Sequence, residues 1–313
     1  GRRAVVQTAR NGRAMGCHSK DMNDRERMFA RYAWMVLGWN VLVVLWGAFV
    51  RASGSGAGCG SHWPLCNGAV IPPSPTMQTV IEFMHRVTSG VALLGVAGLV
   101  LWARKVFPKG HAARKWAWAS LGFIIVEALL GAGLVLLSYV EKNASAGRAV
   151  YLCLHLTNTL LLLAAIEGTA VAARGAKWRW STTPLMLKGA LAAALAASLT
   201  GAIAALGDTV YPATSMIEGV KQEFAAAAPA LLRLRLVHPV VAVLAGFFMM
   251  VAAFMALRGR VKNRVVALCV IQLAAGAVNV VLLAPVWMQI LHLGLAVLIW
   301  IGLVLGTLEE RPA

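Results

Sequence analysis

Eight apolar stretches, each about long enough to cross a bilayer, dominate this chain of 313 residues. A spanning helix needs roughly 20 apolar residues to cross about 30 Å of hydrocarbon, and it satisfies its own backbone hydrogen bonds there. Hydrophobic residues make up 59% of the sequence and charged residues only 13%, about half the share typical of soluble domains. We therefore predict an all-α, multi-pass membrane protein, with spans at about 32–50, 82–103, 116–139, 150–173, 185–206, 233–257, 265–285 and 287–308.

The net charge of +17 would suggest nucleic-acid binding in a soluble protein, but its distribution here indicates topology instead. Lysine and arginine concentrate in residues 1–31 and in the loops after the second, fourth and sixth spans, whereas the other loops hold few of them. Basic loops remain on the cytoplasmic side of a membrane. We therefore place both termini in the cytoplasm, expect residues 1–31 to form a poorly ordered tail, and predict no nucleic-acid partner.

Two of the five cysteines lie in the first outer loop, in the stretch GCGSHWPLCNG. Topology places this loop outside the cytoplasm, where disulfides persist, and a glycine-rich gap can close such a ring. His62 lies between the cysteines, so a metal site is the alternative, although three ligands at irregular spacing are a weak zinc signal. We predict a disulfide between Cys59 and Cys66, either structural or redox-active.

The chain contains an internal repeat. WGAFVRASGSG at the end of the first span corresponds to TGAIAALGD at the end of the fifth, which aligns Gly47 with Gly201. EALLGAGLVLL in the third span corresponds to QLAAGAVNVVLL in the seventh. Four spans followed by four spans of the same orientation form a parallel repeat about an axis along the membrane normal. This predicts two pseudo-symmetric four-helix bundles, residues 32–173 and 185–308.

Four of the seven histidines fall within spans, all on even-numbered helices and four to six residues from the outer end, about 6–9 Å deep. A haem iron takes two axial ligands, and the interior of a helix bundle offers an apolar slot for the porphyrin. Zinc or copper would usually recruit carboxylates or thiolates as well. We predict one haem in each bundle, held by His85 with His155 and by His238 with His292.

Four arginines stand near the same outer edge of the predicted bundles. Their guanidinium groups can pair with haem propionates through charge-assisted hydrogen bonds. The alternative is that their side chains simply extend to the membrane interface. The candidates are Arg51 and Arg86 in the first half, and Arg233 and Arg235 in the second.

The loop VRASGSGAGCGSHWPLCNG, together with IEFMHR, LHLTNTLLLLAA, RLVHPVVAVLAG and ILHLGLAVLIW, resembles the haem A synthase family over about residues 31–308. The resemblance implies a membrane oxidoreductase that converts the C8 methyl of haem O to a formyl group, giving haem A for terminal oxidases. It implies that His238 and His292 hold a haem b cofactor, while the substrate haem O enters between His85 and His155.

The same resemblance implies a setting and partners for the chain. Cysteines in the first outer loop are typical of bacterial members, so we expect the bacterial cytoplasmic membrane and its lipid bilayer. Haem O synthase and an electron donor or acceptor of unknown identity are the expected partners. Many bacterial members carry a second cysteine pair between the fifth and sixth spans, whereas residues 207–232 of this chain contain no cysteine.

The stretch IEFMHR places Glu82 three residues before His85, on the same face of a helix. Arg235 stands at the corresponding distance before His238, so only the first half carries an acid there. In the family the matching glutamate is catalytic, which implies that Glu82 stabilises positive charge or manages protons beside the haem methyl. The alternative is an acid that satisfies the dipole of a helix N-terminus.

A different class of function needs the same four histidines. A dihaem b-type membrane cytochrome would transfer electrons without altering either porphyrin. Glu82 in only one half, together with the loop resemblance, favours the enzyme. A transporter is least favoured, because no matching pair of interrupted spans is present. Glu127 in the third span corresponds to Gln272 in the seventh, and we interpret it as a polar packing contact.

Overall fold

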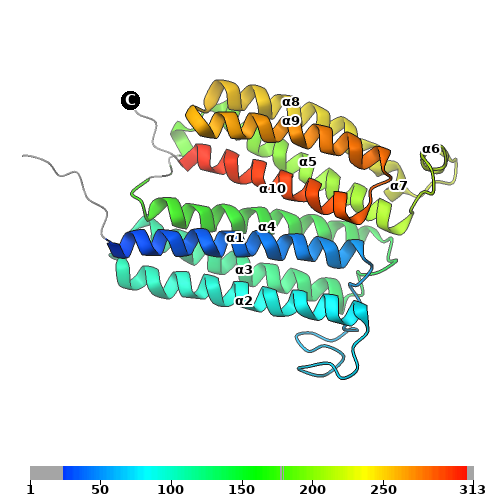
Figure 1. Ribbon diagram of the computed structural model, residues 1–313, viewed down its shortest axis with the longest axis horizontal. Helices are drawn as coiled ribbons and strands as arrows, with labels where there is room; N and C mark the ends of the chain where they lie inside the picture. The colour runs from blue at the N-terminus through cyan, green and yellow to red at the C-terminus, as the bar shows by residue number, and fades with distance from the viewer. Residues whose placement is uncertain (1–23, 177, 179, 309–313) are drawn as a thin grey trace, which may run out of the picture.

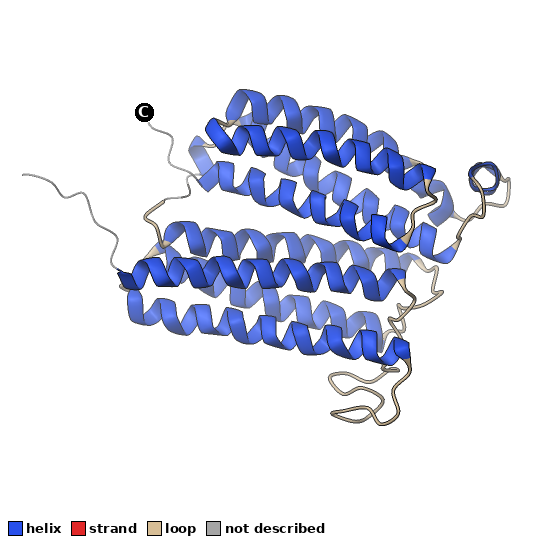
Figure 2. Ribbon diagram, in the orientation of Figure 1, coloured by secondary structure: helices blue, strands red, loops and turns tan. Residues whose placement is uncertain are grey.

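The computed structural model of the chain describes residues 24–176, 178 and 180–308. Eight of its helices are long and apolar enough to cross a membrane, which confirms the predicted all-α membrane protein (Figures 1 and 2). No β-strand occurs among the described residues. Most of the predicted tail, residues 1–23, lies outside them.

The spans differ in their bounds from the predicted stretches. They are α1 (Asp24–Ala52), α2 (Met77–Val106), α3 (Ala112–Leu136), α4 (Ala146–Ala172), α5 (Leu185–Val210), α7 (Ala230–Arg235) continued by α8 (Val237–Ala256), α9 (Gly259–Val281) and α10 (Val286–Leu308). Two shorter elements were not predicted: a 3-10 turn, η1 (Trp180–Thr182), and the helix α6 (Met216–Phe224).

Several helices begin earlier than hydropathy predicted, because polar residues outside the hydrocarbon start them. α1 begins at Asp24, so the end of the predicted tail is helical, with Asp24 and Glu26 in a first turn that favours acids. The hydroxyl of Thr76 caps α2 by accepting the N–H of Thr79. His85 consequently lies eight residues after Met77, further from the helix start than predicted.

The helices form two groups that lie side by side (Figure 1). In the first, α1 packs on α2, α2 on α3, α3 on α4 and α4 on α1; in the second, α5, α8, α9 and α10 close a similar ring. α4 contacts α5, and α10 contacts α1 and α4, which joins the groups. Two apolar cores are centred one on each group, and α10 and α4 also contribute to the core of the opposite group. The pseudo-symmetry between the groups stays a prediction.

The two ends of the molecule differ in character. The start of α1 and the loops after α2, α4 and α8 lie at one end, and lysine and arginine concentrate in these loops and in the helix ends beside them. The loop between α1 and α2 lies at the other end, together with α6 (Figure 1). The basic loops therefore share one side of any membrane that the helices cross.

Candidate functional site

Each of the four histidines within the spans packs its ring against a glycine of a neighbouring odd-numbered span. A Cβ atom built on that glycine would lie 3.0 Å from the nearest ring atom at His85 and His238, 3.1 Å at His292 and 3.9 Å at His155. Three of these separations are tighter than ordinary van der Waals contact, so the rings occupy space that a side chain would fill. The pairs are Gly47–His85, Gly131–His155, Gly201–His238 and Gly276–His292.

The two histidines of the second group lie close together, with their ring planes nearly perpendicular. The ring centroids of His238 on α8 and His292 on α10 lie 6.3 Å apart, with the ring planes at 84°. With metal–nitrogen bonds of about 2.0–2.1 Å on either side, imidazoles that share one ion have centroids about 6–6.5 Å apart. The spacing therefore fits a pair of axial ligands to one iron.

A polar side chain contacts a ring nitrogen of each of these two histidines. The hydroxyl of Thr200 lies 3.2 Å from Nδ1 of His238, and the amide nitrogen of Gln272 lies 3.2 Å from Nε2 of His292. Nδ1 of His292 is buried and has no hydrogen-bond partner. A buried imidazole nitrogen without a partner is uncommon and is typical of a site that a ligand completes.

The first group holds its histidines on α2 and α4. Nδ1 of His85 is buried without a hydrogen-bond partner, and His85 interacts electrostatically with His155 and Glu127. Nδ1 of His155 lies 3.1 Å from a carboxylate oxygen of Glu127 on α3. His85, His155 and Glu127 thus belong to one polar cluster inside an apolar bundle.

The donor sets favour a haem iron over a metal ion held by protein alone. Among the described residues, no three histidine, cysteine, aspartate or glutamate side chains gather closely enough to hold a metal ion. Two histidines suffice for a haem iron, because the porphyrin supplies the remaining nitrogen ligands. The residues present therefore fit a haem in each group.

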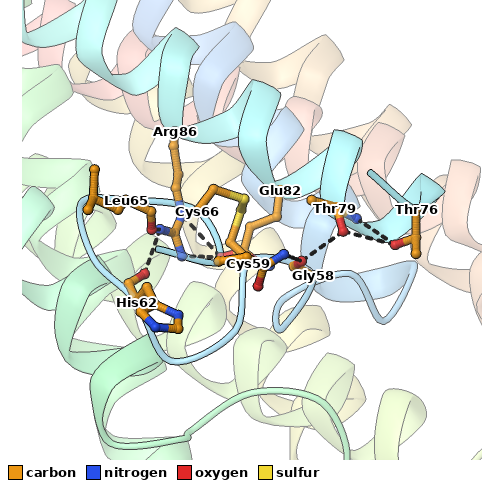
Figure 3. The surroundings of a disulfide bond; sticks show 10 residues. Gly58, Cys59, His62, Leu65, Cys66, Thr76, Thr79, Glu82 and Arg86 are labelled. Carbon is orange, nitrogen blue, oxygen red and sulfur yellow. Dashed lines mark hydrogen bonds and ion pairs between the residues drawn. A yellow bond between two sulfur atoms is a disulfide. The ribbon is translucent and has the colours of Figure 1, made fainter. Parts of the chain in front are cut away.

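Glu82 is held near the start of α2 by two different partners. One carboxylate oxygen, Oε1, accepts hydrogen bonds from Arg86 at 2.6 Å and 3.2 Å, and the other, Oε2, accepts the backbone N–H of Cys59 at 2.8 Å (Figure 3). The residue is only 3% exposed. A buried carboxylate with a charged partner and a backbone donor is fixed in place.

The loop between α1 and α2 closes over this carboxylate. A disulfide joins Cys59 to Cys66, as predicted. Arg86 donates to the carbonyl oxygens of His62 and Leu65 within the loop, at 2.7 Å and 2.6 Å (Figure 3). The imidazole of His62 is exposed, and no metal cluster forms around it among the described residues.

A glycine lets the loop approach the first turn of α2. A Cβ atom on Gly58 would lie 2.4 Å from the backbone of Gln78, closer than real Cβ atoms come to backbone. The carbonyl oxygen of Gly58 accepts the hydroxyl of Thr79 at 2.8 Å. Any larger residue at position 58 would force the loop away from α2, and with it the N–H that holds Glu82.

Arg51 at the end of α1 crosses from the first group of helices to the second. Its guanidinium donates to the carbonyl oxygen of Ala205 at 2.8 Å, to the hydroxyl of Thr209 at 3.0 Å and to the side-chain oxygen of Gln289 at 3.0 Å. These partners lie on α5 and α10. The structure thus places Arg51 between the groups, whereas the sequence assigned it to the first half alone.

The other three arginines already have protein partners. Arg86 contacts Glu82, as described above. Arg235 donates to Glu223 at 2.6 Å and to Asp208 at 3.0 Å, and Arg233 donates to the carbonyl oxygen of Ala226 at 2.9 Å. Propionate binding by these arginines, or by Arg51, stays a prediction.

The glycine beside His85 offers a direct test of the histidine site. In Gly47→Val the new Cβ meets Cε1 and Nε2 of His85 at 3.0 Å and 3.2 Å, so the ring must move, and overpacking of this kind costs about 1–3 kcal/mol. We expect lower haem content and a lower temperature of unfolding in detergent.

Gly38 provides the matched control on the same helix. A Cβ there meets nothing within 4 Å, and the change in helix propensity is the same as at position 47. Gly38→Val is expected to keep the haem content of the natural chain. Equal losses in the two variants would show that the contact with His85 is not responsible.

Comparison with known proteins gives matches over most of the chain. A profile described as cytochrome oxidase assembly protein (COX15-CtaA) matches residues 30–304. A protoheme IX farnesyltransferase of Thermus thermophilus is 46% identical over 289 residues, which cover 87% of this chain and 46% of that protein. The chain therefore spans just under half the length of that relative.

Relatives that match a shorter part of the chain are named heme A synthase. A heme A synthase of Alkalihalophilus pseudofirmus is 43% identical over 95 residues, 30% of this chain and 32% of that protein. A heme A synthase of Halalkalibacterium halodurans is 42% identical over 95 residues, again 30% of this chain and 32% of that protein.

Proposed function

Because the chain belongs to the cytochrome oxidase assembly protein family (COX15-CtaA), we propose that it acts in haem A synthesis, by oxidising the C8 methyl of haem O to a formyl group. Family membership agrees with the resemblance to haem A synthases noted from the sequence. The relatives named heme A synthase support the product. The relative named protoheme IX farnesyltransferase supports the substrate, since haem O is a farnesylated haem.

The observation that carries the proposal is the difference between the two halves at one position. Glu82 stands three residues before His85, buried and held by Arg86 and the N–H of Cys59. At the corresponding place before His238 the chain has Arg235, bound to acids of α5 and α6. A pure electron carrier needs no such difference, whereas an enzyme that modifies one haem does.

In the first half, the histidines and Glu82 have separate roles. His85 and His155 hold the substrate haem by its iron. Oε1 of Glu82 is occupied by Arg86, while Oε2 accepts a single N–H and keeps a lone pair. Oε2 is therefore the atom that can hold a proton released from the methyl group, and the carboxylate charge stabilises positive charge that develops there.

The residues of the second half hold the cofactor. His238 and His292 would ligate haem b, and Gln272 and Thr200 steady their rings. When bound, haem b supplies one-electron transfer. Methyl-to-formyl conversion removes several electrons from the substrate, so a neighbouring redox group suits the reaction.

The basic loops at one end support an orientation of the molecule in its membrane. We assign that end to the cytoplasm of a bacterial cell by the positive-inside rule. The disulfide loop then lies on the oxidising side, where such a bond persists. Haem O synthase and an electron donor or acceptor remain the proposed partners.

The test is extraction and mass analysis of the haems that co-purify with the chain from cells supplied with haem O. Haem A, or its hydroxylated precursor, beside haem b would support the proposal. A variant with His85→Ala and His155→Ala is the control, and it should lose the product while keeping haem b. Two haem b per chain with no modified product would indicate the electron-transfer cytochrome instead.

A further inference from the structure

One partly buried acid has no part in the chemistry described so far. Glu127 lies on α3 with its side chain 19% exposed, and its Oε1 is 3.1 Å from Nδ1 of His155 on α4. The amide of Asn158 donates to its Oε2 at 2.5 Å, and the hydroxyl of Thr159 contacts Oε1. Three neighbours on α4 therefore keep this carboxylate beside the histidine.

The second half places a neutral group at the matching position. Gln272 on α9 corresponds to Glu127 in the repeat, and its amide nitrogen lies 3.2 Å from Nε2 of His292. Each half thus sets a polar side chain from its third span against the histidine of its fourth span. The first half uses a carboxylate and the second an amide.

This difference has a consequence for any iron that the histidines ligate. A ligating histidine usually donates its other ring N–H to an acceptor, which fixes the orientation of the ring and makes it a stronger donor to the metal. A carboxylate can accept that N–H, whereas the amide nitrogen of Gln272 that contacts His292 can only donate, and the carboxylate charge also favours the more positive, ferric state in an apolar interior. Nδ1 of His155 makes no well-directed hydrogen bond in this structure, yet it lies 3.1 Å from Oε1 of Glu127.

We propose that Glu127 is a positioning residue for His155 and that it holds the reduction potential of the haem in the first half below that of the haem in the second half. The inference rests on the proposed function, since it needs a haem between His85 and His155. With that difference in potential, one-electron transfer from the first half to the second would be favourable. Electrons would leave the half that carries Glu82.

Two reciprocal substitutions test this. Glu127→Gln gives the first half the amide of the second, and Gln272→Glu does the reverse. Both are measured in purified chains reconstituted with protohaem IX, by redox titration of the two haems and by the low-spin ferric EPR signal of each. We expect Glu127→Gln to shift the reduction equilibrium of the first haem about tenfold, or about 59 mV, toward the ferrous state. Gln272→Glu is expected to shift the second haem in the opposite sense.

Glu167→Gln is the matched control, since it also removes a buried acid of the first group. It lies twelve residues along α4 from His155, about 18 Å at 1.5 Å per residue. The control should leave the EPR signals unchanged and shift the first potential far less than Glu127→Gln does.

The outcomes separate this inference from the proposed function. Unchanged potentials and EPR signals in both reciprocal variants, with two haems bound, would overturn the role of Glu127 and leave haem A synthesis standing. If Glu127→Gln fails to fold, the shift in Gln272→Glu decides the matter. A natural chain that binds no bis-histidine haem in its first half would overturn the proposed function and this inference together.

Discussion

Glu82→Gln is expected to bind haem in both halves and yet to form haem A at least about a hundredfold more slowly than the natural chain. Positioned acid–base groups contribute about 10²–10⁴-fold to a reaction rate. Glutamine keeps an oxygen for the N–H of Cys59 but loses the charge and the proton acceptor. We expect haem O, or an alcohol intermediate, to accumulate on the protein, as measured by mass analysis of the extracted haems.

Stability must be measured alongside, because the substitution also breaks an ion pair. Arg86 keeps its hydrogen bonds to the carbonyl oxygens of His62 and Leu65 in the loop. The free energy of unfolding should therefore fall by less than the roughly 3–5 kcal/mol typical of a buried charge that has lost its partner. Glu218→Gln, at an acid of α6 outside the spans, serves as the control and should keep full activity. Normal haem A output from Glu82→Gln would remove this residue from the mechanism.

His238→Ala is expected to lose the haem of the second half while the first half keeps its own. The substitution removes one of two axial ligands and leaves a void beside Gly201, whose Cβ position lies 3.0 Å from the ring. Deletion of a ligand typically costs the site most of its metal affinity, since even outer-shell changes cost about 10–100-fold. The measurement is the ratio of haem to protein, with the absorption spectrum of each haem.

His62→Ala controls for loss of a histidine as such, because His62 is exposed and its backbone carbonyl oxygen, which accepts Arg86, is kept in the variant. It should retain both haems. Full haem content in His238→Ala would contradict the pairing of His238 with His292 and would call for another ligand in the second half.

Hydropathy alone was enough to predict the eight spans, because their length is dictated by the thickness of the bilayer. The starts of the helices were less predictable, since they depend on polar caps outside the hydrocarbon, such as Thr76. The helix α6 was missed for the same reason: it is too short and polar for a span, and it is stabilised by contacts such as that between Glu223 and Arg235.

The sequence predicted the main residues of the candidate site but not the groups that contact them. The histidines and Glu82 stood out because polar groups in apolar helices are costly and therefore informative. Their partners did not stand out, since contacts between spans depend on how the helices pack. The N–H of Cys59 that holds Glu82 belongs to a backbone and has no signature in the sequence. Glu127 was interpreted as a packing residue, although its exchange for Gln272 in the repeat was a signal of its contact with a histidine.

Arg51, which crosses between the two groups of helices, bears on whether the two halves could be encoded as separate chains. A chain built from a repeat is, in principle, divisible into two separate genes. Here Arg51 finds its hydrogen-bond acceptors on α5 and α10, and the indole of Trp300 donates to the carbonyl oxygen of Leu160 at 2.9 Å in the buried interface. Each half therefore supplies hydrogen-bond partners for polar groups of the other, and a half separated from its neighbour would leave those groups without them.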